Sequence, residues 1–267
     1  MTLKPLTIDL LLYPAELHSF ILGAKIYDSS CSPHAKVIYI DKDDGYFLKS
    51  SQVGSKKLQD EVELTQYFHK KGLAPEALAY ITNECDHDWL LTTKIQGDDC
   101  TTSKYLDHPE RLCDTIAEQL VLLHNMDFSD CPVQNHTDRY LKTAEYNKQT
   151  DNFDKSYFPD SFGYESPEEA WVVIQKYKNL LKTEILLHGD YCLPNIILKD
   201  WKFSGFVDLD SGGVGDRHVD VFWGIWTLWY NLRTDKFRQR FIDVYGRDII
   251  NEDLLRLVAA IEVFTWC

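Results

Sequence analysis

The chain has 267 residues, of which 44% are hydrophobic and 26% are charged, and its formal net charge is −14 at pH 7. This length suffices for one large domain or for two lobes, and the composition is ordinary for a globular protein. The excess of acids argues against nucleic acid and anionic membrane as partners, because both bind basic surfaces. The chain also lacks the run of about 18 apolar residues that predicts a transmembrane helix.

The N-terminal sequence and the cysteines favour a cytoplasmic location. Asp9 interrupts the apolar stretch that a signal peptide would need, and no small-residue cleavage site follows it. The seven cysteines are scattered and form no Cys-x-x-Cys pair, which is typical of reduced thiols. The acidity is compatible with a cationic substrate, although it is equally explained by solubility alone.

The first third of the chain is predicted to be rich in β-structure. Residues 37–40 and 46–49 flank the turn sequence Asp-Lys-Asp-Asp-Gly, which predicts a hairpin. A helix is expected over about 57–71, where apolar side chains recur at helical spacing. Two further strands are expected over 77–81 and 89–93.

Beyond Gly97 the pattern becomes mainly helical. Ser166 followed by Pro-Glu-Glu predicts a capped helix start. We therefore expect an α+β protein with a β-rich lobe over 1–96 and a mainly helical lobe over 97–267. The other elements expected in the second lobe are helices around 112–123, 171–181, 223–231, 237–244 and 254–261, and short strands at 185–187, 196–198 and 206–207.

The most specific motif is His188-x-Asp190-x-x-x-x-Asn195, with Asp208 thirteen residues beyond the asparagine. Phosphoryl transfer from ATP depends on positioning and charge neutralisation by magnesium, which prefers oxygen ligands. It also needs an acid beside the hydroxyl that is phosphorylated. Asp190 is expected to orient that hydroxyl, Asn195 and Asp208 are the expected magnesium ligands, and His188 is expected to brace the loop.

A strand pair is expected to bring the two magnesium ligands together. Residues 196–198 and 206–209 would form its strands, joined by the turn Asp-Trp-Lys at 200–202. Paired strands hold such ligands with little positional freedom.

This arrangement resembles the kinase catalytic loop, His-x-Asp-x-x-x-x-Asn followed by a metal-binding Asp. The His-Gly-Asp form, Pro194 before the asparagine, and Ser-Gly-Phe-Val-Asp-Leu at 204–209 are similar to the aminoglycoside phosphotransferases, most closely the 3'-phosphotransferase (kanamycin kinase) branch. Segments 127–132, 216–220 and 261–264 are also similar to that branch. The resemblance implies a two-lobed protein-kinase-like fold and ATP- and Mg²⁺-dependent phosphorylation of a kanamycin- or neomycin-type aminoglycoside, which confers antibiotic resistance.

The resemblance also implies a lysine that reaches the ATP phosphates and a helix glutamate that orients it. Lys49 occupies the family's position for the lysine. Glu63 is the expected partner by its place in the helix, and Glu61, two residues earlier, is expected to face elsewhere. The apolar face of this helix is formed by Leu58, Val62, Thr65 and Phe68.

Other nucleotide contacts are implied by position. Ser32 lies in a serine-rich turn where the family covers the phosphates, although a plain surface turn is the alternative. Backbone groups of Lys94 and Ile95 would meet the adenine edge. The glycine-rich segment 212–215 is expected to be a flexible turn rather than a nucleotide loop.

Aminoglycosides are polycations, so carboxylates should line the acceptor site. Asp154 and Asp160 lie in an acidic, loop-like stretch, and Glu262 matches an acid that the family carries. Each of the three is alternatively a solvated surface acid. The expected partner is thus a cationic small molecule, with neither nucleic acid nor membrane involved and with the protein as a monomer or weak dimer.

The chain departs from the family at three places that bear on the acceptor. Asp210-Ser211 stands where Gly-Arg is usual, and the helix after Asp220 is rich in tryptophan. The chain also continues past Phe264 to residue 267. The aromatic residues of the helix are core residues or, alternatively, an aromatic wall that stacks on a ring or cation.

Two alternatives to the aminoglycoside kinase remain open. One is a kinase of the same fold that acts on choline, a sugar or another antibiotic. The other is a nucleotide-binding module without turnover. A protein kinase is disfavoured, because the chain has no Ala-Pro-Glu after the metal Asp.

Overall fold

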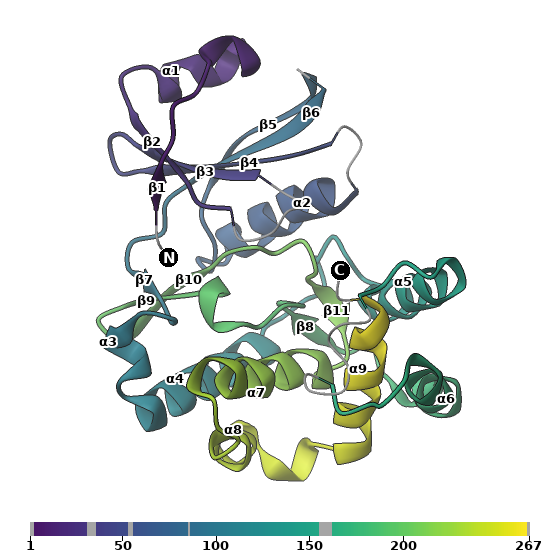
Figure 1. Ribbon diagram of the computed structural model, residues 1–267. Coiled ribbons are helices and arrows are strands. Elements are labelled where there is room, and N and C mark those ends of the chain that lie inside the picture. Colours follow the sequence, from purple (N-terminus) through teal and green to yellow (C-terminus); the bar gives the residue numbers. More distant parts are fainter. Residues whose placement is uncertain (1–2, 31–35, 53–55, 85, 155–161, 266–267) are drawn as a thin grey trace. The chain divides into compact units, whose positions relative to one another are not determined.

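The computed structural model describes residues 3–30, 36–52, 56–84, 86–154 and 162–265 (Figure 1). Its contacts divide the chain into two compact units. The first unit comprises residues 1–102 and 195–211, and the second comprises 103–194 and 212–267. This division differs from the expected boundary at 96/97, because the segment 195–211 packs with the N-terminal residues.

A six-stranded antiparallel sheet forms most of the first unit, in the order β1-β2-β3-β4-β6-β5. The predicted hairpin is its β3–β4 pair, in which Ile38 lies opposite Leu48. Asp43 and Gly45 have positive φ in the connecting turn, where aspartate and glycine are tolerated. The strands are β1 Lys4–Pro5, β2 Lys25–Asp28, β3 Lys36–Asp41, β4 Tyr46–Gln52, β5 Ala77–Glu84 and β6 His87–Thr93.

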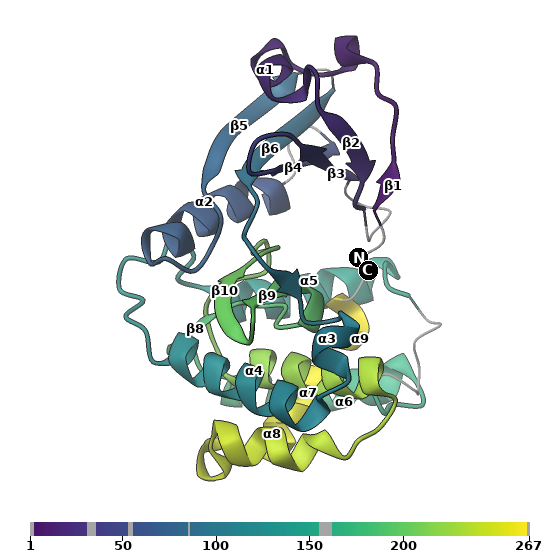
Figure 2. The same ribbon diagram turned by 90° about the vertical axis from the view of Figure 1, so that its left-hand side faces the viewer.

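The two faces of this sheet are covered by different segments (Figure 2). Side chains of the N-terminal segment, such as Leu17 and Ile21, pack against Ile40 and Leu48 on one face. On the other face, helix α2 (Lys56–Lys70) packs against β5 and β6 and buries Leu58. The N-terminal segment contains the 3-10 turns Leu10–Leu12 and Ala15–Leu17 and the short helix α1, His18–Ile21.

A second, three-stranded sheet in the first unit has the order β10-β9-β7. Strands β9 (Ile196–Lys199) and β10 (Lys202–Phe206) form a hairpin whose turn residues Asp200 and Trp201 both have positive φ, as in a type I′ hairpin turn. Strand β7 is Asp98–Asp99. The second strand of the hairpin was expected over 206–209, but it ends at Phe206, so Asp208 lies in the loop beyond it.

The second unit consists of helices around one core. Helix α9 packs against α5, α6 and α7, and Ile261 and Phe264 of α9 are fully buried. Ser166 caps α6 as predicted, because its hydroxyl accepts from the Glu169 backbone N–H at 3.2 Å. The helices are α3 Ser103–Leu106, α4 Pro109–His124, α5 His136–Thr150, α6 Pro167–Tyr177, α7 His218–Leu232, α8 Phe237–Tyr245 and α9 Glu252–Thr265, with 3-10 turns at Lys178–Leu180, Leu193–Asn195 and Arg247–Ile249.

A two-stranded sheet of β8 (Ile185–Leu187) and β11 (Gly213–Gly215) completes the second unit. The prediction of a flexible turn at 212–215 is wrong. The segment is buried and pairs with β8, and the Val214 N–H donates to the Val133 carbonyl at 2.7 Å. Among the described residues, no helix combines the length and the apolar character that crossing a membrane demands.

Candidate functional site

The loop that follows β8 is held by one buried carboxylate. Asp220, in the first turn of α7, accepts from the His188 backbone N–H and from the Gly189 backbone N–H, both at 2.8 Å. Gly189 has a φ of +87°, a conformation that favours glycine. The start of α7 thereby fixes the backbone immediately before Asp190.

Asp220 is itself supported by a buried histidine. His124 Nε2 lies 3.1 Å from Asp220 Oδ2, and His124 Nδ1 lies 2.7 Å from the Tyr245 hydroxyl. Burial lowers the pKa of His124, which favours the neutral ring. Burial raises the pKa of Asp220, but the hydrogen bonds from the His124 side chain and the His188 backbone N–H outweigh it, and the pKa lies below its usual value. The carboxylate is therefore ionised where it receives these donors.

The substitution Asp220→Asn should destabilise the protein. The new amide group would face N–H donors and leave buried groups unsatisfied, at a cost of about 2–4 kcal/mol. We expect the thermal midpoint to fall by about 5–10 °C, measured by circular dichroism. Asp243→Asn, which removes a surface ion pair with Arg247, is the matched control and should change the midpoint little. Equal midpoints for the two variants would contradict this role of Asp220.

The remainder of the loop is anchored on α4 and α7. The Tyr191 hydroxyl donates to the Ile116 carbonyl at 2.7 Å, and the Leu193 N–H donates to Thr227 Oγ1 at 3.0 Å. His188 is fully buried, and its Nδ1 accepts from the Asp190 N–H at 3.3 Å, which is the expected bracing contact. Asp190 is partly exposed, whereas the residues on either side of it are buried.

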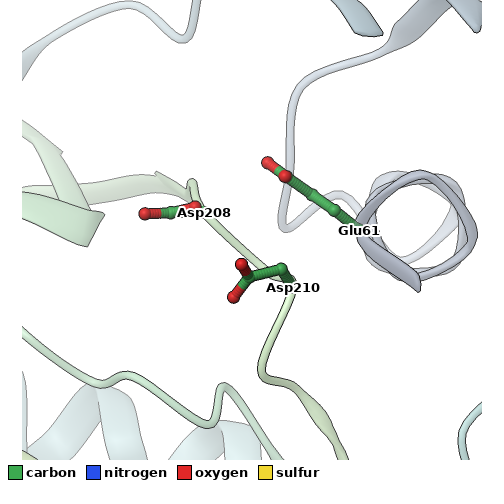
Figure 3. Close-up of side chains that lie close together, drawn as sticks. All are labelled: Glu61, Asp208 and Asp210. Atoms are coloured by element: carbon green, nitrogen blue, oxygen red, sulfur yellow. The ribbon is translucent and has the colours of Figure 1, made fainter. Parts of the chain in front are cut away.

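A cluster of charges forms in the first unit around Lys49, on β4. Lys49 Nζ lies 2.7 Å from Glu61 Oε2 and 2.6 Å from Asp208 Oδ1. Figure 3 shows Glu61 extending from α2 toward the loop that carries Asp208 and Asp210. Carboxylate oxygens of these three acids lie within 4.8 Å of one another.

The prediction that Glu63 is the acid paired with Lys49 is wrong. Glu63 is exposed and accepts from Gln59 Nε2 at 3.4 Å. Glu61 lies three residues after Leu58 and four before Thr65, so helical geometry places it on the buried face. The apolar pattern of the helix therefore already contained the signal that identifies Glu61.

The electrostatics of this cluster keep Lys49 charged. Burial lowers the pKa of Lys49, but the carboxylates of Glu61, Asp208 and Asp210 outweigh it and hold the pKa above its usual value. A cation fixed between acids can bind an anionic phosphate without being lost to deprotonation.

The donor set also fits a magnesium ion. Carboxylate and amide oxygens are the ligands that magnesium prefers, and the cluster offers such oxygens from Asp208 and Asp210. The backbone of Asn195 is hydrogen-bonded to the residue before Asp208, because the Asn195 carbonyl accepts from the Val207 N–H at 3.0 Å. Asp208 has a φ of +60°, a left-handed conformation that aspartate tolerates better than most residues.

Of the other residues expected to contact the nucleotide, the structure describes Lys94 and Ile95. The Lys94 N–H donates to the Gly45 carbonyl at 3.0 Å, so an adenine contact from Lys94 would use its carbonyl. Ile95 follows it, with its side chain close to Gly205. Ser32 lies outside the described residues.

The residues expected on the acceptor side belong to the second unit. Asp154 is exposed in the segment after α5, and Asp160 lies outside the described residues. Glu262 of α9 is only 4% exposed, so it is not a solvated surface acid. Burial raises its pKa to about 7, and hydrogen bonds from Tyr140 and Thr265 oppose that rise.

Comparison with known proteins identifies the family. Residues 32–258 match the model of the phosphotransferase enzyme family. A probable aminoglycoside 3'-phosphotransferase of Lactococcus lactis subsp. lactis is 50% identical over 262 residues, which cover 98% of each chain. The aminoglycoside 3'-phosphotransferase of Niallia circulans is 28% identical over 219 residues, which cover 82% of this chain and 83% of that protein.

A solved structure confirms the predicted fold. Aminoglycoside phosphotransferase APH(3'')-Id from Streptomyces rimosus superposes with a TM-score of 0.78 at 20% identity, covering 98% of this chain and all of that one. The expected β-rich N-terminal part and helical C-terminal part are both observed. The family match, the relatives and the arrangement of Lys49, Glu61 and Asp208 agree, and the chain belongs to the phosphotransferase enzyme family.

Proposed function

We propose that this protein transfers the γ-phosphoryl group of ATP to a hydroxyl of a kanamycin- or neomycin-type aminoglycoside, in a magnesium-dependent reaction that confers resistance. The observation that carries the proposal is the ion-paired cluster of Lys49, Glu61 and Asp208. It provides a fixed cation for phosphates beside oxygen ligands for a metal.

The first unit would handle the nucleotide. Lys49 would bind the α- and β-phosphates, and Glu61 would hold its ammonium group in place. Asn195 and Asp208 would hold magnesium, which neutralises charge on the phosphates when it is bound. The adenine would meet backbone groups of Lys94 and Ile95, and Ser32 would cover the phosphates.

Asp190, in the second unit, would orient the acceptor hydroxyl and accept its proton. The hydroxyl oxygen then forms a bond to the γ-phosphorus as the bond between that phosphorus and the β–γ bridging oxygen breaks, which releases ADP. The chain links the two sets of residues directly, because Asn195 follows Asp190 by five positions.

The relatives and the charge of the chain support an aminoglycoside as acceptor. The relative at 50% identity is named a probable aminoglycoside 3'-phosphotransferase, and APH(3'')-Id has been solved with ADP and streptomycin. The net charge of −14 suits a polycation, with Asp154, Asp160 and Glu262 as the proposed acceptor-site acids. We further propose that the protein works in the cytoplasm, where ATP is available, as a monomer or weak dimer.

An acceptor panel tests this function. Purified protein is mixed with Mg-ATP and, separately, with kanamycin, neomycin, choline or simple sugars, and ADP release is followed. Turnover with aminoglycosides alone is the expected result. Turnover only with choline or a sugar would move the protein to another substrate class, and ATP binding without any turnover would overturn the enzymatic proposal.

Glu61→Gln and Glu63→Gln form a matched pair of variants on one helix. Glu61→Gln should lower kcat/KM for ATP about 10- to 100-fold, because Lys49 loses a buried charged partner that positions it. Glu63→Gln changes an exposed acid and should leave kcat/KM within about twofold. A larger loss in Glu63→Gln than in Glu61→Gln would refute the assignment.

A further inference from the structure

Helix α7 binds the loop on both sides of Asp190. The first turn of α7 accepts from the two backbone N–H groups that precede Asp190, and Thr227 Oγ1, two turns later, accepts from the Leu193 N–H at 3.0 Å. Within the loop, the Asp190 N–H donates to His188 Nδ1 at 3.3 Å, and the Asp190 carbonyl accepts from the Cys192 N–H at 2.8 Å. Both main-chain polar groups of Asp190 are therefore engaged, and the torsions of its side chain remain to be set.

The Thr227 hydroxyl has a fixed orientation. Its oxygen also accepts from Asn231 Nδ2 at 3.2 Å, and the same Nδ2 donates to the Thr227 carbonyl at 2.8 Å. A hydroxyl group has two acceptor positions and one proton, so the donors from Leu193 and Asn231 fill both acceptor positions. Thr227 is only 1% exposed, which leaves a protein group as the acceptor of its proton.

The Cys192 thiol is hydrogen-bonded both to Thr227 and to the Asp190 side chain. Cys192 is buried, and burial first, followed by the charge and the hydrogen bond of Asp190, raises the pKa of the thiol well above its usual range. The thiol therefore keeps its proton, and an ionised carboxylate can only accept a hydrogen bond. The direction of the chain follows: the Thr227 hydroxyl donates to the Cys192 sulfur, and the Cys192 S–H donates to Asp190.

We infer that Thr227 and Cys192 are positioning residues that aim the Asp190 carboxylate at the acceptor hydroxyl, an inference that rests on the proposed phosphoryl transfer. Thr227 fixes the main chain beyond Asp190, and Cys192 fixes the side chain. Proton transfer requires the carboxylate to lie within hydrogen-bond reach of the hydroxyl. A reacting group that is held in this orientation raises kcat, because less freedom is lost on the way to the transition state.

Conservative variants test both residues. Thr227→Val keeps the shape of the side chain but cannot accept from the Leu193 N–H, and we expect kcat for aminoglycoside phosphorylation to fall about 10- to 30-fold. Cys192→Ala should lower kcat about fivefold, and for both variants KM for ATP and KM for the acceptor should stay within about twofold. Thr227→Ser and Cys192→Ser keep a hydrogen-bonding group at each position and should restore kcat to within about threefold of the wild-type value.

Two buried residues of the same unit provide matched controls. The Thr137 hydroxyl donates to the Lys182 carbonyl at 2.8 Å, and Cys113 Sγ donates to the Phe237 carbonyl at 3.7 Å. Thr137→Val and Cys113→Ala remove the same chemical groups from hydrogen bonds outside the Asp190 loop. They should therefore leave kcat within about twofold of the wild-type value, even where they lower the thermal midpoint.

Combination with Asp190→Asn separates positioning from general stability. In that background the carboxylate that the two residues aim is already absent, so Thr227→Val and Cys192→Ala should lower the residual kcat by less than about twofold. Equal fold losses in the two backgrounds would overturn the inference, as would wild-type kcat in both single variants or equal losses in the controls. Absence of wild-type turnover with every aminoglycoside would instead overturn the proposed function, so the two failures are distinguishable.

Discussion

Asp190→Asn is expected to lower kcat for aminoglycoside phosphorylation about 10³-fold. The amide retains the size of the carboxylate but cannot accept the proton of the acceptor hydroxyl, and general-base catalysis contributes a factor of this order. ATP binding should persist, because the residues proposed to bind the nucleotide lie in the first unit. Steady-state ADP release measures kcat, and isothermal titration calorimetry with ATP measures the affinity for the nucleotide.

The same variant needs a control for folding. Asp190 is partly exposed, so the variant should keep the wild-type thermal midpoint, in contrast to Asp220→Asn. Asp243→Asn, on the outer surface of α8, should retain the full rate. A rate for Asp190→Asn close to that of the wild type would show that another group accepts the proton.

Spacing in the sequence was sufficient to predict a phosphotransferase, which the family match confirms. His188, Asp190, Asn195 and Asp208 have fixed separations that few other functions require, and the loop backbone is bound to Asp220 as a rigid element. The hairpin of β3 and β4 and the helix α2 were also predictable, because their apolar residues recur with the period of their own secondary structure.

The errors arose where tertiary packing decides between local alternatives. Glu61 and Glu63 differ by two positions, and only the packing of α2 on the sheet determines which one reaches Lys49. The glycines at 212–215 suggested a turn, but pairing with β8 makes the segment a buried strand. Local propensity is a weak guide at such places, because long-range contacts override it.

The role of Glu262 shows a further limit of sequence reasoning. Its position matched a family acid, but its donors come from Tyr140 on α5, Trp223 on α7 and Thr265 on α9. No local pattern connects these residues, which are up to 125 positions apart. Whether an acid is offered to a ligand or held by the protein depends on contacts of this kind.

Asp208→Asn should abolish most magnesium-dependent turnover, with a loss of about 10³-fold. The variant removes a negatively charged ligand, and a metal that stabilises charge on transferring phosphate is worth several kcal/mol. Asparagine is the appropriate replacement because it tolerates the left-handed conformation of this residue, whereas alanine would add a backbone cost of about 1 kcal/mol. The rate is measured as a function of magnesium concentration.

Asp210→Asn tests whether Asp210 binds the magnesium ion directly or only contributes a negative charge near it. Its carboxylate lies in the same cluster, but the expected ligands are Asn195 and Asp208. We expect Asp210→Asn to raise the magnesium concentration for half-maximal rate about threefold and to leave the saturated rate unchanged, because only a screened charge is lost. Asp208→Asn should stay slow at every magnesium concentration. If saturating magnesium restored Asp208→Asn but not Asp210→Asn, the metal would be held by the aspartate that stands where the family usually has glycine.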